Sequence, residues 1–158
     1  ERFQRSLADY NIEDPILAER IGEDYIDVCP RKNKLYPHAI EVLDYLKERY
    51  ELHIITNGFD KTQHIKLEHS NLKPYFNQII TSEKTGVKKP NPLIFSHALT
   101  LANAIKDESV YIGDNLIVDI LGCQNSGIDG VYFNPERIEH AENPKFEIEC
   151  LSELKKIF

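Results

Sequence analysis

The sequence predicts an α/β protein with a three-layer, Rossmann-like parallel sheet and helices on both faces. Short apolar runs of strand length alternate with segments of helix length, and this order is typical of a parallel sheet. The chain has 158 residues, enough for one core-bearing domain and short for two. Its residues are 41% hydrophobic and 28% charged, the balance of a soluble globular protein.

The first thirty residues differ from the rest of the chain. Ile16, Leu17 and Ile21 give residues 1–30 a helical pattern, and this segment contains no run that reads as a strand. All predicted strands lie in residues 31–158. Residues 1–30 therefore look like the last part of a larger helical unit.

Four strands are predicted in the remainder. They are Leu52–Ile55, Gln78–Ile80, Val110–Ile112 and Gly130–Phe133. A helix is expected before the first strand, from about Pro37 to Arg49. Proline suits its first position, and its apolar stripe contains Ile40, Leu43 and Leu46.

Two further helices are expected between the strands. Asn91 is suited to cap a helix that Pro92 opens, and its buried face is predicted to contain Ile94, Ala98 and Leu101. A short helix is expected from Leu116 to Cys123. Each helix lies between consecutive strands, as the crossover connections of a parallel sheet require.

Charge and composition argue against several kinds of partner. The net charge is −7 and the lysines and arginines are scattered, which argues against binding to nucleic acid. No apolar run approaches the roughly 20 residues of a membrane span, and the first residues do not resemble a signal peptide. Three widely spaced cysteines predict free thiols and a cytoplasmic protein. The oligomeric state is not readable from the sequence.

Polar residues follow three of the predicted strands, at the edge where a parallel sheet binds ligands. Thr56-Asn57-Gly58 offers a hydroxyl, an amide and a glycine at a helix start, which together suit an anion. Lys89 lies just ahead of a helix and provides a point charge for phosphate. Asp114 follows the third strand, and Asp119 lies in the helix after it. Hard carboxylate oxygens beside a phosphate suit Mg²⁺.

Each feature also has a plainer explanation when it is taken alone. Thr56-Asn57-Gly58 resembles a turn, Lys88-Lys89 a solvated loop, and Asp114 a helix cap. The histidines have no zinc-ligand spacing, and His53 is expected to be packed within its strand. Tyr36, Tyr45 and Tyr50 are expected at the core or its boundary. The joint occurrence of the three polar segments favours a site.

These segments resemble three motifs of the haloacid dehalogenase-like hydrolase superfamily. The matching stretches are Thr56-Asn57-Gly58, the loop from Ser82 to Phe95 with its Lys-Pro-Asn, and Gly113 to Ile120. They occur in the family's order and at its spacing, within about residues 30 to 135. Thr56-Asn57-Gly58-Phe59 and the long loop are most similar to the phosphatase branch that includes pyrimidine 5'-nucleotidases of the YjjG/YfnB type.

The resemblance implies a Mg²⁺-dependent phosphomonoester hydrolase that acts on small phosphorylated metabolites. Thr56 would bind the phosphoryl group together with Asn57 and Gly58, and Lys89 would neutralise it. Asp114 would ligate Mg²⁺, and Asp119 would hold the lysine or a metal-bound water, so both acids are candidate metal residues.

One motif of the family is not found in this sequence. The family's nucleophile belongs to an Asp-x-Asp on the first strand, which lies between the strands that end at Thr56 and Asp114. No Asp-x-Asp occurs here. We therefore expect a carboxy-terminal fragment, inactive on its own because it lacks the nucleophile, in which residues 1–30 are the remnant of a helical cap and residues 31–158 a core without its first strand. A gap, or a strand from another segment, is expected between the two strands.

Other functions remain open at this point. A 2-haloacid dehalogenase shares the scaffold but needs no Mg²⁺, and Asp114 with Asp119 favours the metal-using branch. A receiver domain places its acids before its threonine and lysine, whereas the order here is Thr56, Lys89, Asp114. An inactive, truncated family member that serves as a binding module is a further alternative.

Overall fold

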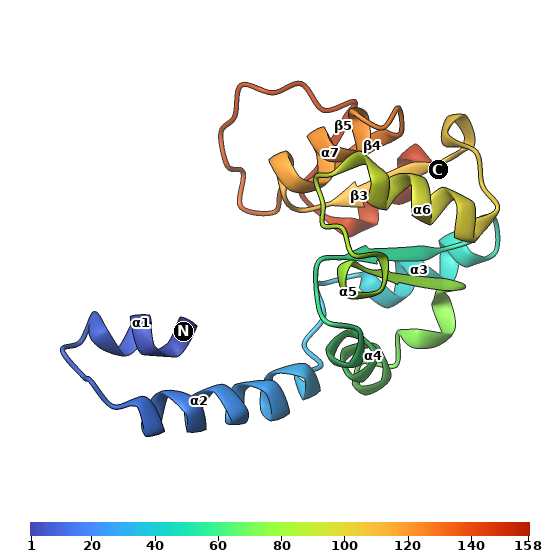
Figure 1. Cartoon of the computed structure of the whole chain (residues 1–158). Helices are drawn as coiled ribbons and strands as arrows, with labels where there is room; N and C mark the ends of the chain where they lie inside the picture. The colour runs from blue at the N-terminus through green and yellow to red at the C-terminus, as the bar shows by residue number, and fades with distance from the viewer.

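The computed structural model describes residues 1–158 and places five strands among helices (Figure 1). The strands are β1 (His53–Thr56), β2 (Gln78–Thr81), β3 (Val110–Gly113), β4 (Asp129–Phe133) and β5 (Phe146–Ile148). The α-helices are α1 (Arg2–Ala8), α2 (Pro15–Val28), α3 (Ala39–Lys47), α4 (Asp60–His69), α5 (Ser82–Thr85), α6 (Pro92–Ala102), α7 (Gly122–Gln124) and α8 (Leu154–Ile157). A π-helical segment, η4 (Leu116–Leu121), and four short 3-10 turns complete the chain.

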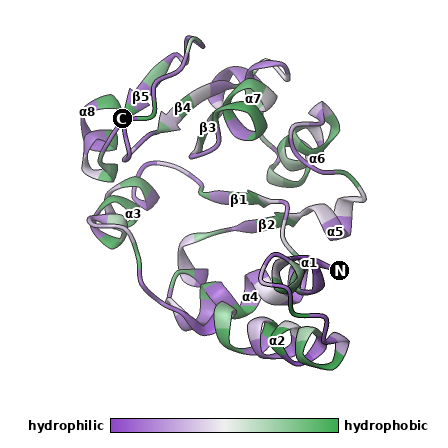
Figure 2. Ribbon diagram, turned by 90° about the vertical axis from the view of Figure 1, so that its left-hand side faces the viewer, coloured by the Kyte–Doolittle hydropathy of each residue, from purple (hydrophilic) through white to green (hydrophobic).

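The strands form two parallel sheets. β1 pairs with β2 so that Thr56 lies opposite Thr81, while β4 lies between β3 and β5. In Figure 2, β1 lies beside β2 and β3 beside β4 as two separate groups. β1 and β3 each keep one unpaired edge, so the sheet is interrupted between them, where the sequence predicts a gap.

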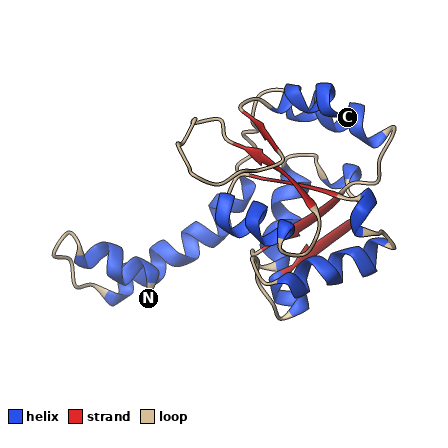
Figure 3. Cartoon of the chain, turned by 90° about the horizontal axis from the view of Figure 1, so that it is seen from above, coloured by secondary structure: helices blue, strands red, loops and turns tan.

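Helices cover both faces of these strands, as the fold class requires (Figure 3). On one side α3 and α8 pack against β4 and β5, and the buried residues are Val42, Leu46, Val131, Phe133, Ile148 and Leu154. On the other side α6 and α7 pack near β2, with Ile80, Ile94, Phe95, Ala98, Cys123 and Ile128 buried. Alternate residues of β4 serve the two faces: Val131 enters the first core, while Gly130 faces Cys123 and Ile120.

The predicted strands agree with the structure to within a residue at each end, but two helix predictions need correction. α3 begins at Ala39, and Pro37 lies in the preceding turn, because His38 has φ 64° and breaks the helix there. Of the predicted stripe, Leu46 is buried and Leu43 half-buried as expected, whereas Ile40 is exposed and Val42 is buried in its place. In α6 the Asn91 cap is present and accepts from the Leu93 N–H, whereas Leu101 is exposed.

Helices α1 and α2 form an arm that extends away from the strands (Figures 1 and 3). Asp14 caps α2 and accepts from the Leu17 N–H, and Pro15 opens the helix. The two helices contact each other through the rings of Phe3 and Tyr25, whose centroids are 5.6 Å apart. The helical prediction for this segment is therefore correct. None of the helices combines the length and the apolar character needed to cross a membrane.

Candidate active site

The centre of the candidate site is a buried ion pair. The Nζ of Lys89 lies 2.6 Å from Oδ1 of Asp119, and the two side chains are 11% and 5% exposed. Lys89 belongs to the loop between α5 and α6, and Asp119 to η4. Asp119 packs directly against the backbone of Gly113 at the end of β3. Any other residue at position 113 would clash, because its Cβ would lie 2.5 Å from the Cβ of Asp119.

Asp119 is bound by protein groups at both of its oxygens. Oδ1 accepts from Lys89 and from the hydroxyl of Tyr111, and Oδ2 accepts from the Asn115 N–H at 3.1 Å. Asn115 also caps η4 through Val118. Of the two roles that the resemblance implies for Asp119, this geometry favours holding the lysine. π-helical turns are frequently found at functional sites.

Tyr111 is a site residue that the sequence did not indicate. Its hydroxyl accepts from Lys89 Nζ at 2.8 Å and lies 3.3 Å from both Asp119 Oδ1 and the Ile55 carbonyl oxygen. Burial, and then the charge of Asp119, raise the pKa of Tyr111 well above its usual range, so the phenol stays protonated. The only signal in the sequence is the hydroxyl group of a tyrosine within the otherwise apolar strand segment that ends at Gly113.

Thr56 and Asn57 lie at the end of β1, beside the lysine loop. The Gly58 N–H donates to Thr56 Oγ1 at 3.1 Å, which leaves the hydroxyl hydrogen of Thr56 available to an acceptor. The Asn57 amide bonds to the backbone of Lys89: Oδ1 accepts from the N–H at 2.8 Å, and Nδ2 donates to the carbonyl oxygen at 3.0 Å. The side chain that was expected at the phosphate is therefore engaged with Lys89.

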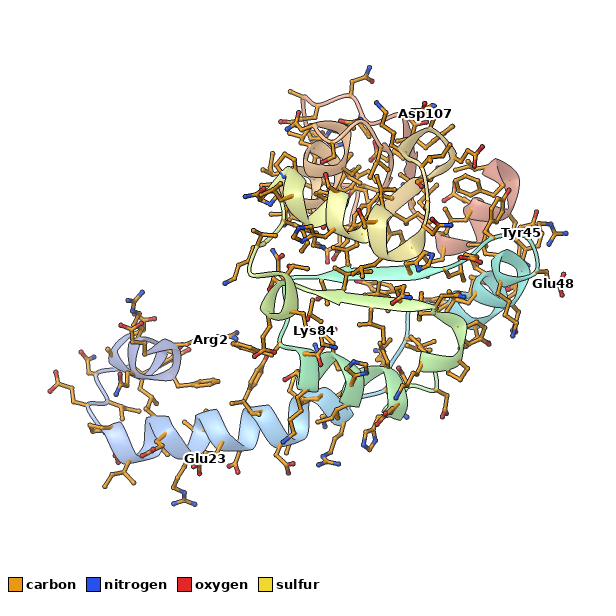
Figure 4. The ribbon with its side chains drawn as sticks, turned by 45° about the vertical axis from the view of Figure 1, so that its right-hand side comes forward. Arg2, Glu23, Tyr45, Glu48, Lys84 and Asp107 are labelled. Atoms are coloured by element: carbon orange, nitrogen blue, oxygen red, sulfur yellow. The ribbon has the colours of Figure 1, made fainter.

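The start of α4 is already bound by a carboxylate. Glu83 Oε2 of α5 accepts from the Asp60 N–H at 2.8 Å. The Asp60 carboxylate bonds to Lys84 at 2.9 Å and to the hydroxyl of Thr81, and the hydrogen bond from Lys84 is the main cause of its lowered pKa. Lys84 is labelled in Figure 4, where it lies between α5 and α4. These contacts hold the turn after Thr56 against β2 and α5.

Asp114 is exposed at the end of β3 and makes no hydrogen bond or ion pair with the protein. Its charge is a minor contribution to the raised pKa of Tyr111 and of Tyr132, after burial and nearer acidic groups. The chain contains no group of three or more histidine, cysteine or acidic side chains arranged for a metal. A free carboxylate fits a Mg²⁺ that completes its shell with substrate oxygens and water.

The predicted residues are thus joined by a chain of contacts. Asn57, which follows Thr56, bonds to the lysine loop, Lys89 reaches Asp119, and Asp119 bonds to Asn115, which follows Asp114. The remaining candidate, Gly58, lies in the same turn as Thr56. The histidines of α4 remain outside this group, although His64 lies 3.6 Å from Asp60.

A parallel α/β fold with Thr56 and Asp114 at the ends of two strands, and with a buried Lys89–Asp119 pair, is typical of a Rossmann-like hydrolase. The chain belongs to the haloacid dehalogenase-like hydrolase family, whose model matches residues 4–133. This confirms the resemblance in the three motifs.

Two curated relatives and one solved structure support this assignment. The chain is 31% identical over 159 residues to pyrimidine 5'-nucleotidase YjjG of Escherichia coli, covering 99% of this chain and 69% of the relative. It is 38% identical over 159 residues to pyrimidine 5'-nucleotidase PynA of Streptococcus pneumoniae, covering 97% and 65%. The magnesium-bound HAD hydrolase YfnB of Bacillus subtilis superposes with a TM-score of 0.90 at 30% identity, covering 99% and 68%. The chain therefore spans about two thirds of the length of these proteins.

Proposed function

We propose that this protein is a Mg²⁺-dependent phosphomonoester hydrolase of small phosphorylated metabolites, with nucleoside 5'-monophosphates as the first candidates. The buried Lys89–Asp119 pair carries the proposal, because it fixes an ammonium group on the loop whose backbone is bound by Asn57, the residue next to Thr56. Two curated relatives named as pyrimidine 5'-nucleotidases support this choice of substrate. The free cysteines are consistent with a cytoplasmic location.

Each residue has a distinct task in this proposal. Thr56 donates its hydroxyl hydrogen to a phosphoryl oxygen, and Lys89 neutralises the charge that the phosphoryl group carries through the transition state. Asp119 holds the lysine in place. Asp114 would hold Mg²⁺, which, when bound, polarises a phosphoryl oxygen as a Lewis acid.

The residues present account for phosphate binding, charge neutralisation and one metal ligand. Family members form an aspartyl-phosphate on the first Asp of an Asp-x-Asp, and residues 1–158 contain no such pair. We assign the nucleophile to none of Asp114, Asp119 or Asp60. Asp119 is bound by Lys89 and Asp60 by Lys84, and a metal role suits Asp114.

Substrate profiling of a form of the protein that includes the Asp-x-Asp strand tests this function. Release of phosphate from nucleoside 5'-monophosphates and from sugar phosphates is measured with Mg²⁺ and with excess chelator. We expect turnover that depends on Mg²⁺ and that falls by at least about 100-fold in Asp114→Asn, because the metal loses its anionic ligand. The free energy of unfolding should change little, since Asp114 is exposed and unpaired. Metal-independent release of halide from 2-haloacids, without phosphatase activity, would contradict the proposal.

A further inference from the structure

The amide of Asn57 clamps the backbone of a residue 32 positions away in the chain. Its oxygen accepts from the Lys89 N–H and its nitrogen donates to the Lys89 carbonyl oxygen, at 2.8 and 3.0 Å. Both bonds have good length, and together they fix the position and the orientation of one peptide segment. The clamp uses one of the two N–H donors and one of the two oxygen lone pairs of the amide.

The loop that carries Lys89 has few other anchors. It connects α5, which ends at Thr85, to α6, which begins at Pro92. Within the loop the Asn91 N–H donates to the Lys88 carbonyl oxygen. The hydroxyl of Thr85 donates to the Val87 carbonyl oxygen. These bonds shape the loop locally, whereas the Asn57 clamp ties it to the end of β1.

Lys89 also connects two parts of the fold that share no strand pairing. Its ammonium is held by Tyr111 of β3 and Asp119 of η4, and its backbone by Asn57, next to β1. β1 and β3 belong to different sheets. Without the clamp, the lysine would be tied to β1 only through Tyr111, whose hydroxyl lies 3.3 Å from the Ile55 carbonyl oxygen, and its position relative to Thr56 would be less closely fixed.

We propose that Asn57 is a positioning residue, which acts on the phosphoryl group only through Lys89. The inference rests on the proposed function and adds that Thr56 and Asn57, in the same turn, have different roles. Thr56 contacts substrate, and Asn57 sets the distance between Thr56 and the lysine. Errors of about 1 Å in such a distance can cost about 100-fold in rate.

Two substitutions and one control test the clamp. Asn57→Ala removes both bonds, and Asn57→Asp keeps the acceptor for the Lys89 N–H but sets a carboxylate against the Lys89 carbonyl oxygen. We expect kcat with the best phosphomonoester to fall by about 10- to 100-fold in both. Asn91→Ala serves as the control: it removes the one hydrogen bond that this side chain accepts, from the Leu93 N–H, in the same loop and without touching Lys89. Its kcat should stay within about twofold of wild type, and an equal loss there would overturn the proposal.

A double-mutant cycle separates positioning from direct binding. Inorganic phosphate binding by calorimetry and turnover are measured for Asn57→Ala, Lys89→Met and the double variant. If Asn57 acts through Lys89, adding Asn57→Ala to Lys89→Met costs less than about twofold more. Independent, multiplying losses would show that Asn57 contacts phosphate itself and would overturn the proposal.

Amide hydrogen exchange gives a readout that needs no activity. The Lys89 N–H should exchange at least about tenfold faster in Asn57→Ala than in wild type, and at the wild-type rate in Asn91→Ala. Unchanged exchange at Lys89 in Asn57→Ala would overturn the clamp. Faster exchange in Asn57→Ala, together with a Lys89→Met variant that turns over phosphomonoesters at the wild-type rate, would uphold the clamp and refute the proposed function.

Discussion

A buried ammonium group needs a partner on each side that it faces, and Lys89 shows how this chain provides them. Asp119 supplies the counter-charge, Tyr111 a neutral acceptor, and Asn57 fixes the backbone. A charge taken out of water is costly unless it is paired and hydrogen-bonded. These bonds therefore hold the lysine ready before any phosphate arrives, which is the preorganisation that favours charge stabilisation in catalysis.

Tyr111→Phe tests the neutral partner of this lysine. The substitution removes only the hydroxyl that accepts from Lys89 Nζ and lies near Ile55, and the ring contact with Phe95 at 5.3 Å is retained. We expect kcat/KM to fall by about tenfold, since one of the two side-chain partners of the ammonium is lost, with a cost in stability of about 1 kcal/mol. Steady-state kinetics and urea unfolding measure the two effects. An unchanged kcat/KM would show that Asp119 alone positions the lysine.

Asp119→Ala tests the charged partner. It leaves the Lys89 ammonium unpaired at a position where the side chain is only 11% exposed. We expect a loss of about 3 kcal/mol in the free energy of unfolding, and a smaller loss in Asp119→Ala/Lys89→Met, which removes both charges. Urea unfolding of the single and double variants gives this comparison. Additive losses would mean that the two charges do not interact in the folded protein.

At the scale of the elements, four of the five strands were predictable, because each is a short apolar run and three of the runs are followed by polar residues or glycine. The strand that was missed, β5, has three residues with Glu147 at its centre, too short and too polar for the pattern. α3 starts late because His38 takes a positive φ, which the sequence pattern does not reveal. The positions of Thr56, Lys89 and Asp119 followed from strand order. The Asn57 clamp and the Tyr111 contact join residues far apart in sequence, so no local pattern could indicate them.

β1 contains a half-buried histidine whose protonation opposes folding. His53 has its Nδ1 buried without a partner, and burial lowers its pKa, an effect only partly offset by Glu51. The unfolded chain therefore binds a proton more readily than the folded protein, so the contribution of His53 to stability is full above about pH 6.5 and is lost as pH falls below it. We expect His53→Leu to reduce the fall in the free energy of unfolding between pH 7 and pH 5. Urea unfolding across this range measures it, and an unchanged slope would contradict the assignment.

At the scale of the whole molecule, the active-site residues occupy the boundary between two sheets. The 2-stranded sheet carries Thr56 and the 3-stranded sheet carries Asp114, and Lys89 contacts both sides. The Tyr111 hydroxyl, near the Ile55 carbonyl oxygen, is a further link between β3 and β1. Because few contacts join the sheets directly, the separation of the site's two halves depends on the side chains that bridge them.

The same boundary leaves one edge of β1 and one edge of β3 without a strand partner. Unpaired edges offer a row of N–H and C=O groups to other chains, and a lysine on an edge strand opposes such pairing. On β3, Val110 and Ile112 are also exposed, at 40% and 37%. We therefore expect residues 1–158 to self-associate with rising concentration, and Val110→Lys to weaken this association by at least about threefold.

Sedimentation velocity between about 5 and 200 μM measures the association, with thioflavin fluorescence to detect assembly through strands. Ile105→Lys is the matched control: it removes an apolar residue that is 58% exposed but lies outside any strand. If exposed apolar surface alone drives association, Ile105→Lys weakens it as much as Val110→Lys. If the free edge of β3 drives it, only Val110→Lys does so, because the lysine then stands where another chain would have to pair. A monomer at every concentration would show that the two edges shield each other across the boundary.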